Sequence, residues 1–472
     1  MKVLLIFPDN PKERYGHYSK VGSYLPPLGV CYLAAIAEKA GHKVKIIDNS
    51  IMCWHVKKIV EEIKKYNPDC IGVSSTSIMI PIAKNYAQEI KKEKQLAKIP
   101  LIIGGPGVTS NKEGIFKTCF DFGIYGEGEY TFSEFLSALE KKKSYNKIKG
   151  LIINSKNKKK INPPRPFIEN LDELPLPAIH LLPKLKNYRV DPDRSAAVPI
   201  GTIISSRGCP FNCAFCDHNI FSHRWRAHSA ERIVKEMKRL IYKFGVKEID
   251  FEDDLFIFDK KRILEICRLI KKEGIKIKWQ CRTRPNLVDE EILKEMASAG
   301  CWLISFGVES GSQRILNLIK KGITIEQVKK TVILAHKYKI KPRGYFMINH
   351  PSETREELKS TIDLALNLPF HTIIVCITTP YPNTELWKIA AKYGKLKADT
   401  DQMTEFAGDP NFVTNGFTKE ELIKLQKKFY MKFFFRPKQI LKYISWFLSP
   451  PPKNFFRLFK SYFFAAITVL RI

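Results

Sequence analysis

The sequence predicts an α/β protein in which a doubly wound parallel sheet precedes a partial (β/α)6 TIM-like barrel and a C-terminal helical region. Short apolar runs alternate with amphipathic stretches near the N-terminus, and the same alternation resumes at about residue 201. The chain has 472 residues and is 44% hydrophobic, so it is long enough for two or three domains. The predicted parts are a first domain over 1–145, a linker over 146–200, the barrel over 201–418 and the helical region over 419–472.

The first domain is expected to have short buried strands separated by helices. The strand candidates are KVLLIF, KVKIID, CIGVSS, PLIIGG and FGIYG, each bounded by Gly, Pro or polar residues. Ligands of such sheets collect at the carboxyl ends of the strands. Residues 154–177 then combine a basic run with several prolines, which predicts an exposed linker.

Six strand–helix units follow the linker. The strand candidates are GTIISS, KEIDFE, IKIKWQCR, CWLISFGV, PRGYFMI and TIIVCIT, and helical patterns follow most of them. Six units are too few for a complete eight-unit barrel. We therefore expect an open, partial barrel with its site at the carboxyl ends of the strands.

Charge and cysteine usage limit the partners and the compartment. The chain has 79 Lys+Arg against 48 Asp+Glu, a formal charge of +31. This charge suits either a lysine-coated surface or attraction to an anionic partner, and no basic-aromatic motif indicates nucleic acid. MKVLLIFPDN suits a buried strand better than a signal peptide, so we expect the 11 cysteines to be free thiols in the cytoplasm.

The C-terminal region is rich in aromatic and basic residues. Its longest uncharged apolar run, Ser461 to Leu470, is shorter than the about 20 residues that span a bilayer. Residues 419–446 suit either a helical lid on the barrel or an interfacial helix. For residues 454–472 we expect peripheral contact with an anionic membrane surface.

A cysteine triplet dominates the start of the barrel. The stretch SSRGCPFNCAFCDH, residues 205–218, contains Cys209, Cys213 and Cys216. A zinc site would need a fourth ligand from His218, His223 or His228, but zinc sites favour cysteine pairs set far apart. Three thiolates can instead hold three corners of a [4Fe-4S] cubane and leave one iron open to a chelating substrate. The spacing favours the cluster.

The triplet, Cys-x3-Cys-x-aromatic-Cys at the end of a first barrel strand, resembles the radical S-adenosylmethionine superfamily. The resemblance implies that S-adenosylmethionine chelates the unique iron. An electron from a donor such as flavodoxin or ferredoxin would then cleave it to a 5′-deoxyadenosyl radical. Other residues at successive strand ends favour one shared pocket for this cofactor. The expected cofactor contacts are Phe215, Asp253, Asp254, Arg284, Glu309 and Ser310.

The fifth barrel strand runs into YFMINHPSETREEL, which resembles the superfamily's Gly-x-Pro-Gly-Glu-Thr turn. Pro351, Glu353 and Thr354 match, whereas Ser352 replaces the second glycine. His350 stands in the approach to the turn and is a candidate catalytic acid or base facing the substrate, although a lone polar His is more often a loop residue.

The order of the parts resembles radical S-adenosylmethionine proteins with a cobalamin-binding domain of flavodoxin/Rossmann type. This subgroup includes an anaerobic porphyrin cyclase, hopanoid methylases and antibiotic C-methyltransferases. The resemblance implies a cobalamin site at the strand ends, without an Asp-x-His-x-x-Gly ligand motif, whereas the alternative is a domain used only as scaffold. The expected cobalamin contacts are Ser74, Ser75, Gly104, Gly105, Gly107, Gly126 and Gly128.

These features together predict a radical enzyme that transfers methyl from cobalamin to an unactivated carbon of an amphiphilic small molecule, such as a lipid, isoprenoid or tetrapyrrole. One alternative is a cobalamin-independent cyclase or oxidoreductase. A tRNA methylthiotransferase would want clustered N-terminal cysteines, which the sequence lacks. A non-catalytic metal-binding module on a membrane would leave the polar strand ends unexplained.

Overall fold

The computed structural model describes residues 1–12, 23–155, 158–188, 190, 194–397, 410–437 and 439–441. The chain divides into two compact units. The first unit comprises Met1–Arg189 together with Asn219–Ser222 and Arg226–His228, and the second comprises the remaining residues.

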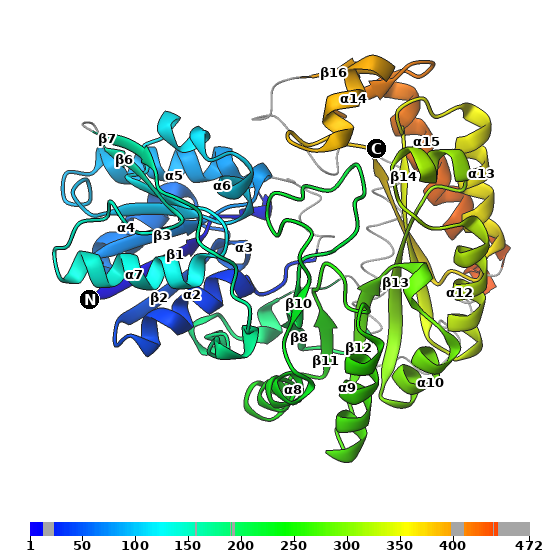
Figure 1. Ribbon diagram of the computed structural model, residues 1–472, viewed down its shortest axis with the longest axis horizontal. Helices are drawn as coiled ribbons and strands as arrows, with labels where there is room; N and C mark the ends of the chain where they lie inside the picture. The colour runs from blue at the N-terminus through cyan, green and yellow to red at the C-terminus, as the bar shows by residue number, and fades with distance from the viewer. Residues whose placement is uncertain are drawn as a thin grey trace. The chain divides into compact units, whose positions relative to one another are not determined.

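The first unit is built on one twisted sheet in the strand order β2-β1-β3-β4-β5-β6-β7 (Figure 1). The first five strands are parallel, and β6 and β7 are antiparallel additions. The strands are β1 Lys2–Phe7, β2 Lys43–Asp48, β3 Cys70–Ser74, β4 Leu101–Gly104, β5 Phe122–Ile124, β6 Leu151–Ser155 and β7 Lys158–Ile161.

Helices connect the parallel strands of this sheet. The helix α4 shows why: its apolar residues Ile59, Val60 and Ile63 recur at helical spacing and are buried in the core with Leu4 and Ile71. α4 packs beside α5, and α2 packs beside α7. The helices are α2 Leu28–Lys39, α3 Asn49–Met52, α4 Val56–Tyr66, α5 Ile80–Lys92, α6 Pro106–Ser110 and α7 Gly128–Glu140. The predicted doubly wound domain is confirmed.

The structure differs from the sequence-based expectation over residues 146–200, where a linker is predicted. The hairpin β6–β7 extends the sheet beyond β5, and its apolar residues Leu151, Ile152 and Ile153 are buried. The lysines of β7 lie on the outermost strand, where charged side chains discourage further strand pairing. The segment of three lysines followed by prolines therefore has a composition typical of a linker, although it forms the edge strand of the sheet.

A buried ion pair lies within the first unit. The Arg226 Nη1 atom donates to Glu127 Oε2 at 2.8 Å and to the Ile168 carbonyl at 2.6 Å. The same carboxylate oxygen accepts the Ile168 N–H, and the Arg226 guanidinium stacks on Phe167. Both charged side chains are buried, so each charge depends on its partner for stabilisation.

We expect Glu127→Ala to lower the free energy of unfolding of the first unit by about 3–5 kcal/mol, because the variant leaves the Arg226 charge buried and unpaired. Urea denaturation followed by circular dichroism measures the change. The matched control is Glu134→Ala, which removes a half-exposed partner of Arg165 and should cost about 0–1 kcal/mol. Equal losses in both variants would contradict the prediction.

The second unit contains a six-stranded, wholly parallel sheet in the order β15-β14-β13-β12-β11-β8. Each strand runs into a helix, which confirms the predicted partial barrel. The strands are β8 Ile200–Ile203, β11 Glu248–Phe251, β12 Lys278–Thr283, β13 Cys301–Glu309, β14 Lys341–Ile348 and β15 Thr372–Ile377. The short strands β9 Ser206–Arg207 and β10 Arg226–Ala227, and the pair β16 Gly394–Leu396 and β17 Phe412–Thr414, lie outside this sheet.

Helices cover one face of this sheet, as α9, α10, α12 and α13 show in Figure 1. Ile249, Phe251, Trp279 and Phe306 are buried apolar residues of the strands, and polar residues alternate with them along β11 and β12. The helices are α8 Ala230–Phe244, α9 Lys260–Lys272, α10 Glu290–Ser298, α11 Gln313–Leu318, α12 Ile325–Lys337, α13 Arg355–Asn367 and α14 Glu385–Tyr393.

The helix α15, Lys419–Phe434, packs on β15 and α13. Its residues Leu422, Phe429 and Phe433 are buried, and the Tyr430 hydroxyl contacts the Val375 backbone. Over these residues the structure shows the packed alternative. Residues 454–472, for which membrane contact is predicted, lie outside the described residues. Among the helices that are described, none is both long and apolar enough to cross a membrane.

Candidate functional site

The cysteine loop follows the first barrel strand and is fixed at its centre. The Ala214 N–H donates to the Ile319 carbonyl at 2.9 Å, and the Ala214 carbonyl accepts the Leu386 N–H at 2.7 Å. Gly208 enters the loop with a φ of +82°, which favours glycine, and its N–H donates to the Asp254 carboxylate. The backbone therefore presents all three cysteines on one anchored loop.

Cations lie beside the buried cysteine of this loop. A hydrogen bond with Cys216 lowers the pKa of Cys213 to about 5 against the effect of burial. The positive charges of Lys321 and Arg284 lower it further. The thiolate is the form of cysteine that binds metals, so this environment suits a metal ligand.

The donor set fits a [4Fe-4S] cluster better than a single zinc ion. In the described part of the chain, no group of three His, Cys, Asp or Glu side chains is arranged to hold one metal ion. Zinc requires four ligands that converge on one ion, whereas each cluster thiolate binds a different iron. Each of the three histidines considered for zinc has another hydrogen-bond partner. His218 and His223 contact the Cys213 and Phe211 carbonyls, and His228 pairs with Asp172 in the first unit.

Arg284 approaches the cysteine loop directly, at the end of β12. Its Nη1 atom lies 3.1 Å from the Cys213 sulfur, and its guanidinium carbon lies 3.9 Å from the centre of the Phe211 ring. The Nε and Nη2 atoms are buried and have no hydrogen-bond partner among the described residues. Such donors are seldom left unsatisfied, so they indicate a place for an anionic group such as a carboxylate.

Glu309 forms a second polar contact near the loop, with Lys321, a residue that the sequence did not predict to belong to the site. The Lys321 ammonium donates to Glu309 Oε1 at 2.6 Å, and both side chains are buried. The same ammonium lies 5.6 Å from the centre of the Phe215 ring. A Cβ at Gly307 would come within 2.7 Å of both charged groups, so glycine makes room for the pair. One lysine in a lysine-rich chain gives no local signal.

Three predicted cofactor contacts are occupied within the protein. Asp253 is buried and accepts hydrogen bonds from the Ser205 N–H and the Ser206 hydroxyl. Asp254 accepts the Gly208 N–H, and the Ser310 hydroxyl lies 3.2 Å from the Thr361 hydroxyl. These side chains hold the strand ends and the loop in place.

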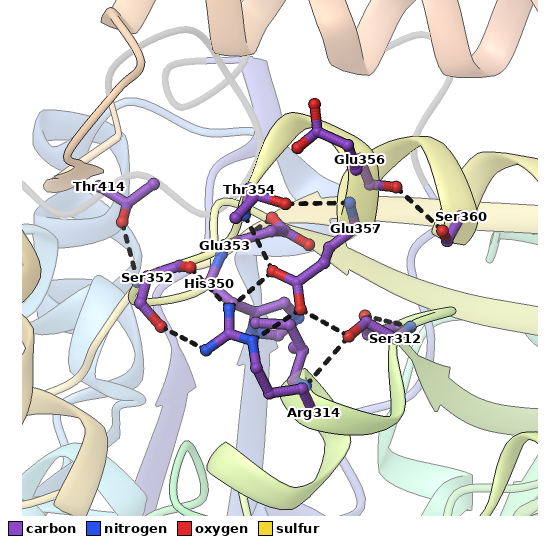
Figure 2. A network of polar contacts seen from close by, with 12 residues as sticks. Ser312, Arg314, His350, Ser352, Glu353, Thr354, Glu356, Glu357, Ser360 and Thr414 are labelled. Atoms are coloured by element: carbon purple, nitrogen blue, oxygen red, sulfur yellow. Dashed lines mark hydrogen bonds and ion pairs between the residues drawn. The ribbon is translucent and has the colours of Figure 1, made fainter.

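Hydrogen bonds fix the turn after β14, in which Ser352 stands in place of the second glycine. Glu353 Oε2 accepts the N–H groups of Asn349 at 2.6 Å and His350 at 3.2 Å. Ser352 has a φ of +59°, the left-handed region where glycine is favoured. Arg314 donates to both the hydroxyl and the carbonyl of Ser352, as Figure 2 shows. These bonds offset the strain of a non-glycine residue.

Arg314 also joins this turn to the start of α13 (Figure 2). Its guanidinium forms two hydrogen bonds with the Glu357 carboxylate, at 2.8 and 2.6 Å, and Ser312 donates to the same group. The hydrogen bond with Arg314 lowers the pKa of Glu357 to about 2. The segment after β13 and the turn after β14 are therefore linked by one ionised network.

His350 is completely buried beside this network. Burial lowers its pKa to about 4, although backbone groups of Glu309 and Met347 act in the opposite direction. Burial likewise raises the pKa of Glu353 to about 8. The ring is therefore neutral at physiological pH, and its predicted role as a catalytic acid or base stays a prediction.

The predicted cobalamin contacts gather at the carboxyl edge of the first unit's sheet. Ser74 and Gly104 are paired at the ends of β3 and β4, and Gly126 follows β5. Gly126 has a φ of +74°, and nothing lies within 4 Å of a Cβ built there. The open space at Gly126 leaves room for a ligand at this edge, where ligands of such sheets collect.

Other glycines of this group are needed for close packing between the loops at this edge. A Cβ at Gly105 would lie 2.6 Å from the Ser75 carbonyl oxygen, and one at Gly107 would lie 2.7 Å from the Thr76 carbonyl carbon. These glycines let the loops after β3 and β4 approach each other. Ser75 is buried in that contact, and Gly128 begins α7 against Leu33.

Comparison with known families agrees with the division of the chain into two units. The radical SAM superfamily model matches residues 203–365, and the B12 binding domain model matches residues 18–136. The chain is 39% identical over 446 residues to an uncharacterized methyltransferase of Pyrococcus horikoshii, which covers 94% of each chain. It is 26% identical to cytidylyl-2-hydroxyethylphosphonate methyltransferase of Streptomyces wedmorensis, covering 85% of each.

Solved structures share the fold at low sequence identity. The cobalamin-dependent S-adenosylmethionine radical enzyme OxsB superposes with a TM-score of 0.74 at 18% identity, covering 95% of this chain and 70% of that one. The methyltransferase TsrM of Kitasatospora setae superposes with a TM-score of 0.66 at 18% identity, covering 93% and 82%.

Proposed function

The chain belongs to the radical S-adenosylmethionine superfamily, in the group with a B12-binding domain, and we propose that it transfers a methyl group from cobalamin to an unactivated carbon of a small molecule. The observation that carries the proposal is the anchored three-cysteine loop flanked by two buried cations, Arg284 and Lys321. Methyl transfer also requires a place for cobalamin, and the open space at Gly126, on the strand edge of the first unit, supports one.

The residues have distinct roles in this proposal. Cys209, Cys213 and Cys216 would each hold one iron of the cluster, and the unpartnered donors of Arg284 would bind an anionic group of S-adenosylmethionine. Lys321, whose ammonium lies near the Phe215 ring, would hold the Glu309 carboxylate in position to contact the cofactor. When bound, the cluster with S-adenosylmethionine supplies a radical that removes hydrogen from carbon, and cobalamin supplies the methyl group.

We further propose an amphiphilic substrate, an electron donor of the flavodoxin or ferredoxin type, and membrane contact through residues 454–472. Relatives at 25% identity include a hopanoid C-3 methylase and an anaerobic magnesium-protoporphyrin IX monomethyl ester cyclase, whose names indicate such substrates. The charge of +31 and the aromatic C-terminal sequence favour an anionic surface. A cyclase or oxidoreductase without methyl transfer is the alternative that the cyclase relative supports.

Anaerobic reconstitution with iron, sulfide and hydroxocobalamin tests the proposal. We expect about one corrinoid per chain, seen in the absorbance spectrum after gel filtration, and reductive cleavage of S-adenosylmethionine to 5′-deoxyadenosine. Gly126→Val should lower corrinoid binding at least about tenfold, because it places a branched side chain with a positive φ at the open edge. Gly416→Val, at a positive-φ glycine of the second unit with equally open space, is the matched control. Cleavage without any corrinoid would favour the cyclase alternative.

A further inference from the structure

The face of the second unit's sheet that carries Arg282 is strongly polar. Paired residues of a parallel sheet share a face, and Arg282 pairs with Ser305, which in turn pairs with Arg343. Tyr345 follows Arg343 by two residues and therefore lies on this face as well. Barrel interiors are usually filled by branched apolar side chains. Charged groups at these positions therefore need a reason other than packing.

Arg282 is fully engaged with neighbouring acids. It donates to both Asp250 oxygens, at 3.1 and 3.3 Å, to Glu252 at 2.7 Å and to the Phe251 carbonyl at 2.8 Å. Asp250 is buried. This set of bonds fixes one guanidinium firmly and leaves it little capacity for a further ligand.

Arg194 is held differently beside the same acids. Its Nη2 atom lies 3.7 Å from Asp250 and 4.0 Å from Glu252, which is beyond hydrogen-bond distance. Its Nε atom is buried without a hydrogen-bond partner among the described residues. Its side chain is 18% exposed, close to the 20% of Arg282 and the 29% of Glu252, so solvent reaches this group. Arg194 therefore has one buried donor, Nε, without a partner among the described residues, and its Nη2 atom lies outside hydrogen-bond distance of both acids.

The electrostatic environment of Tyr345 favours negative charge. The Tyr345 side chain is hydrogen-bonded with Arg282, which fixes its hydroxyl beside this guanidinium. Burial raises the pKa of Tyr345, but the charges of Arg343, Arg282 and Arg194 outweigh burial and lower it. Burial and the charge of Asp250 raise the pKa of Glu252 to about 7, so this acid is only partly ionised at neutral pH. An anion beside the Tyr345 hydroxyl would consequently meet more positive than negative charge.

We propose that Arg194 and Tyr345 form a binding site for an anionic group of the substrate, a carboxylate or a phosphate-type group, with Arg282 as a positioning residue. Arg282 lies near the end of β12, and Arg284 directly follows that strand two residues later, so the site adjoins the residues assigned to S-adenosylmethionine. The inference rests on the proposed function, because the anion is part of that enzyme's substrate. An amphiphile with an anionic head group agrees with both the proposed amphiphilic substrate and the proposed anion site.

Isothermal titration of the reconstituted holoenzyme with three small probes tests the site. The probes are propionate, methylphosphonate and the neutral analogue propanamide, at constant ionic strength. We expect saturable binding of at least one anion and none of the amide, and the anion that binds more tightly identifies the head group. Arg194→Gln should weaken the binding of that anion at least about tenfold, because charge-assisted hydrogen bonds are lost.

Two further variants make the experiment decisive. Tyr345→Phe keeps the ring and should weaken anion binding even if Arg194→Gln folds poorly. Arg268→Gln removes an exposed arginine of α9 that pairs with Glu265, and it should leave binding unchanged. Equal binding of propanamide and propionate, or unchanged anion binding in both Arg194→Gln and Tyr345→Phe, would overturn the inference. Failure of the proposed function would show separately, as absent cleavage of S-adenosylmethionine.

Discussion

Replacing Cys213 with alanine is expected to remove the iron–sulfur cluster and to abolish reductive cleavage of S-adenosylmethionine. The wild-type chain should bind about four irons after anaerobic reconstitution, because three thiolates hold three corners of a cubane. Cys213 is the buried member of the triplet, beside Arg284 and the Ala214 anchor. With two thiolates left, the cluster has too few protein ligands to persist.

The iron content, the absorbance near the thiolate-to-iron bands and the yield of 5′-deoxyadenosine measure this effect. Cys119→Ser is the matched control, because Cys119 is an exposed free cysteine outside the triplet. The control should keep its iron and its cleavage rate. A Cys213→Ala protein that still binds four irons and cleaves the cofactor would contradict the assignment, whereas one zinc per chain in the wild type would favour the metal-binding module.

The architecture was predictable because buried strands and helices require apolar residues at regular positions in the sequence. Strands such as Lys2–Phe7 and Cys301–Glu309 are nearly continuous apolar runs, as expected where helices cover a parallel sheet. The cysteine triplet could equally be identified from the sequence, since its three cysteines are close together in the chain. The hairpin β6–β7 was not, because an edge strand made of lysines carries no apolar alternation.

The less predictable parts of the site come from residues that are distant in sequence. Arg314 stabilises the left-handed Ser352 across 38 positions, and Arg284 reaches Cys213 across 71. Asp253 looked like a cofactor ligand from its position, but the serines that occupy it lie 47 and 48 residues away. Local patterns indicate which residues stand at a strand end, whereas the contacts of each side chain depend on the neighbouring strands.

Lys321→Met is expected to weaken the binding of S-adenosylmethionine by about 10- to 100-fold. The ammonium of Lys321 is the hydrogen-bond donor that the described residues provide for Glu309 Oε1, at 2.6 Å. A hydrogen bond to a charged group contributes about 1.5–3 kcal/mol, which corresponds to this change in affinity. Removing the lysine leaves the buried carboxylate without its partner, so its orientation is no longer fixed.

The neighbouring lysine provides a matched control. Lys320 is half-exposed and pairs with Glu385 at the surface, so Lys320→Met should leave the affinity unchanged. Lys321→Arg should restore part of the affinity, because it keeps the positive charge. Equilibrium dialysis gives the dissociation constant, and the change in the electron paramagnetic resonance spectrum of the reduced cluster on cofactor addition reports binding at the iron.

A double-mutant cycle separates a role in cofactor binding from a role in folding. Glu309→Gln with Lys321→Met removes both charges and should recover the thermal stability that the single Lys321→Met variant loses, since no unpaired charge remains buried. The cofactor affinity should stay low in the double variant, because the ionised carboxylate is still missing. If affinity recovered together with stability, the pair would serve the fold alone, and the assignment of Glu309 to the cofactor would be wrong.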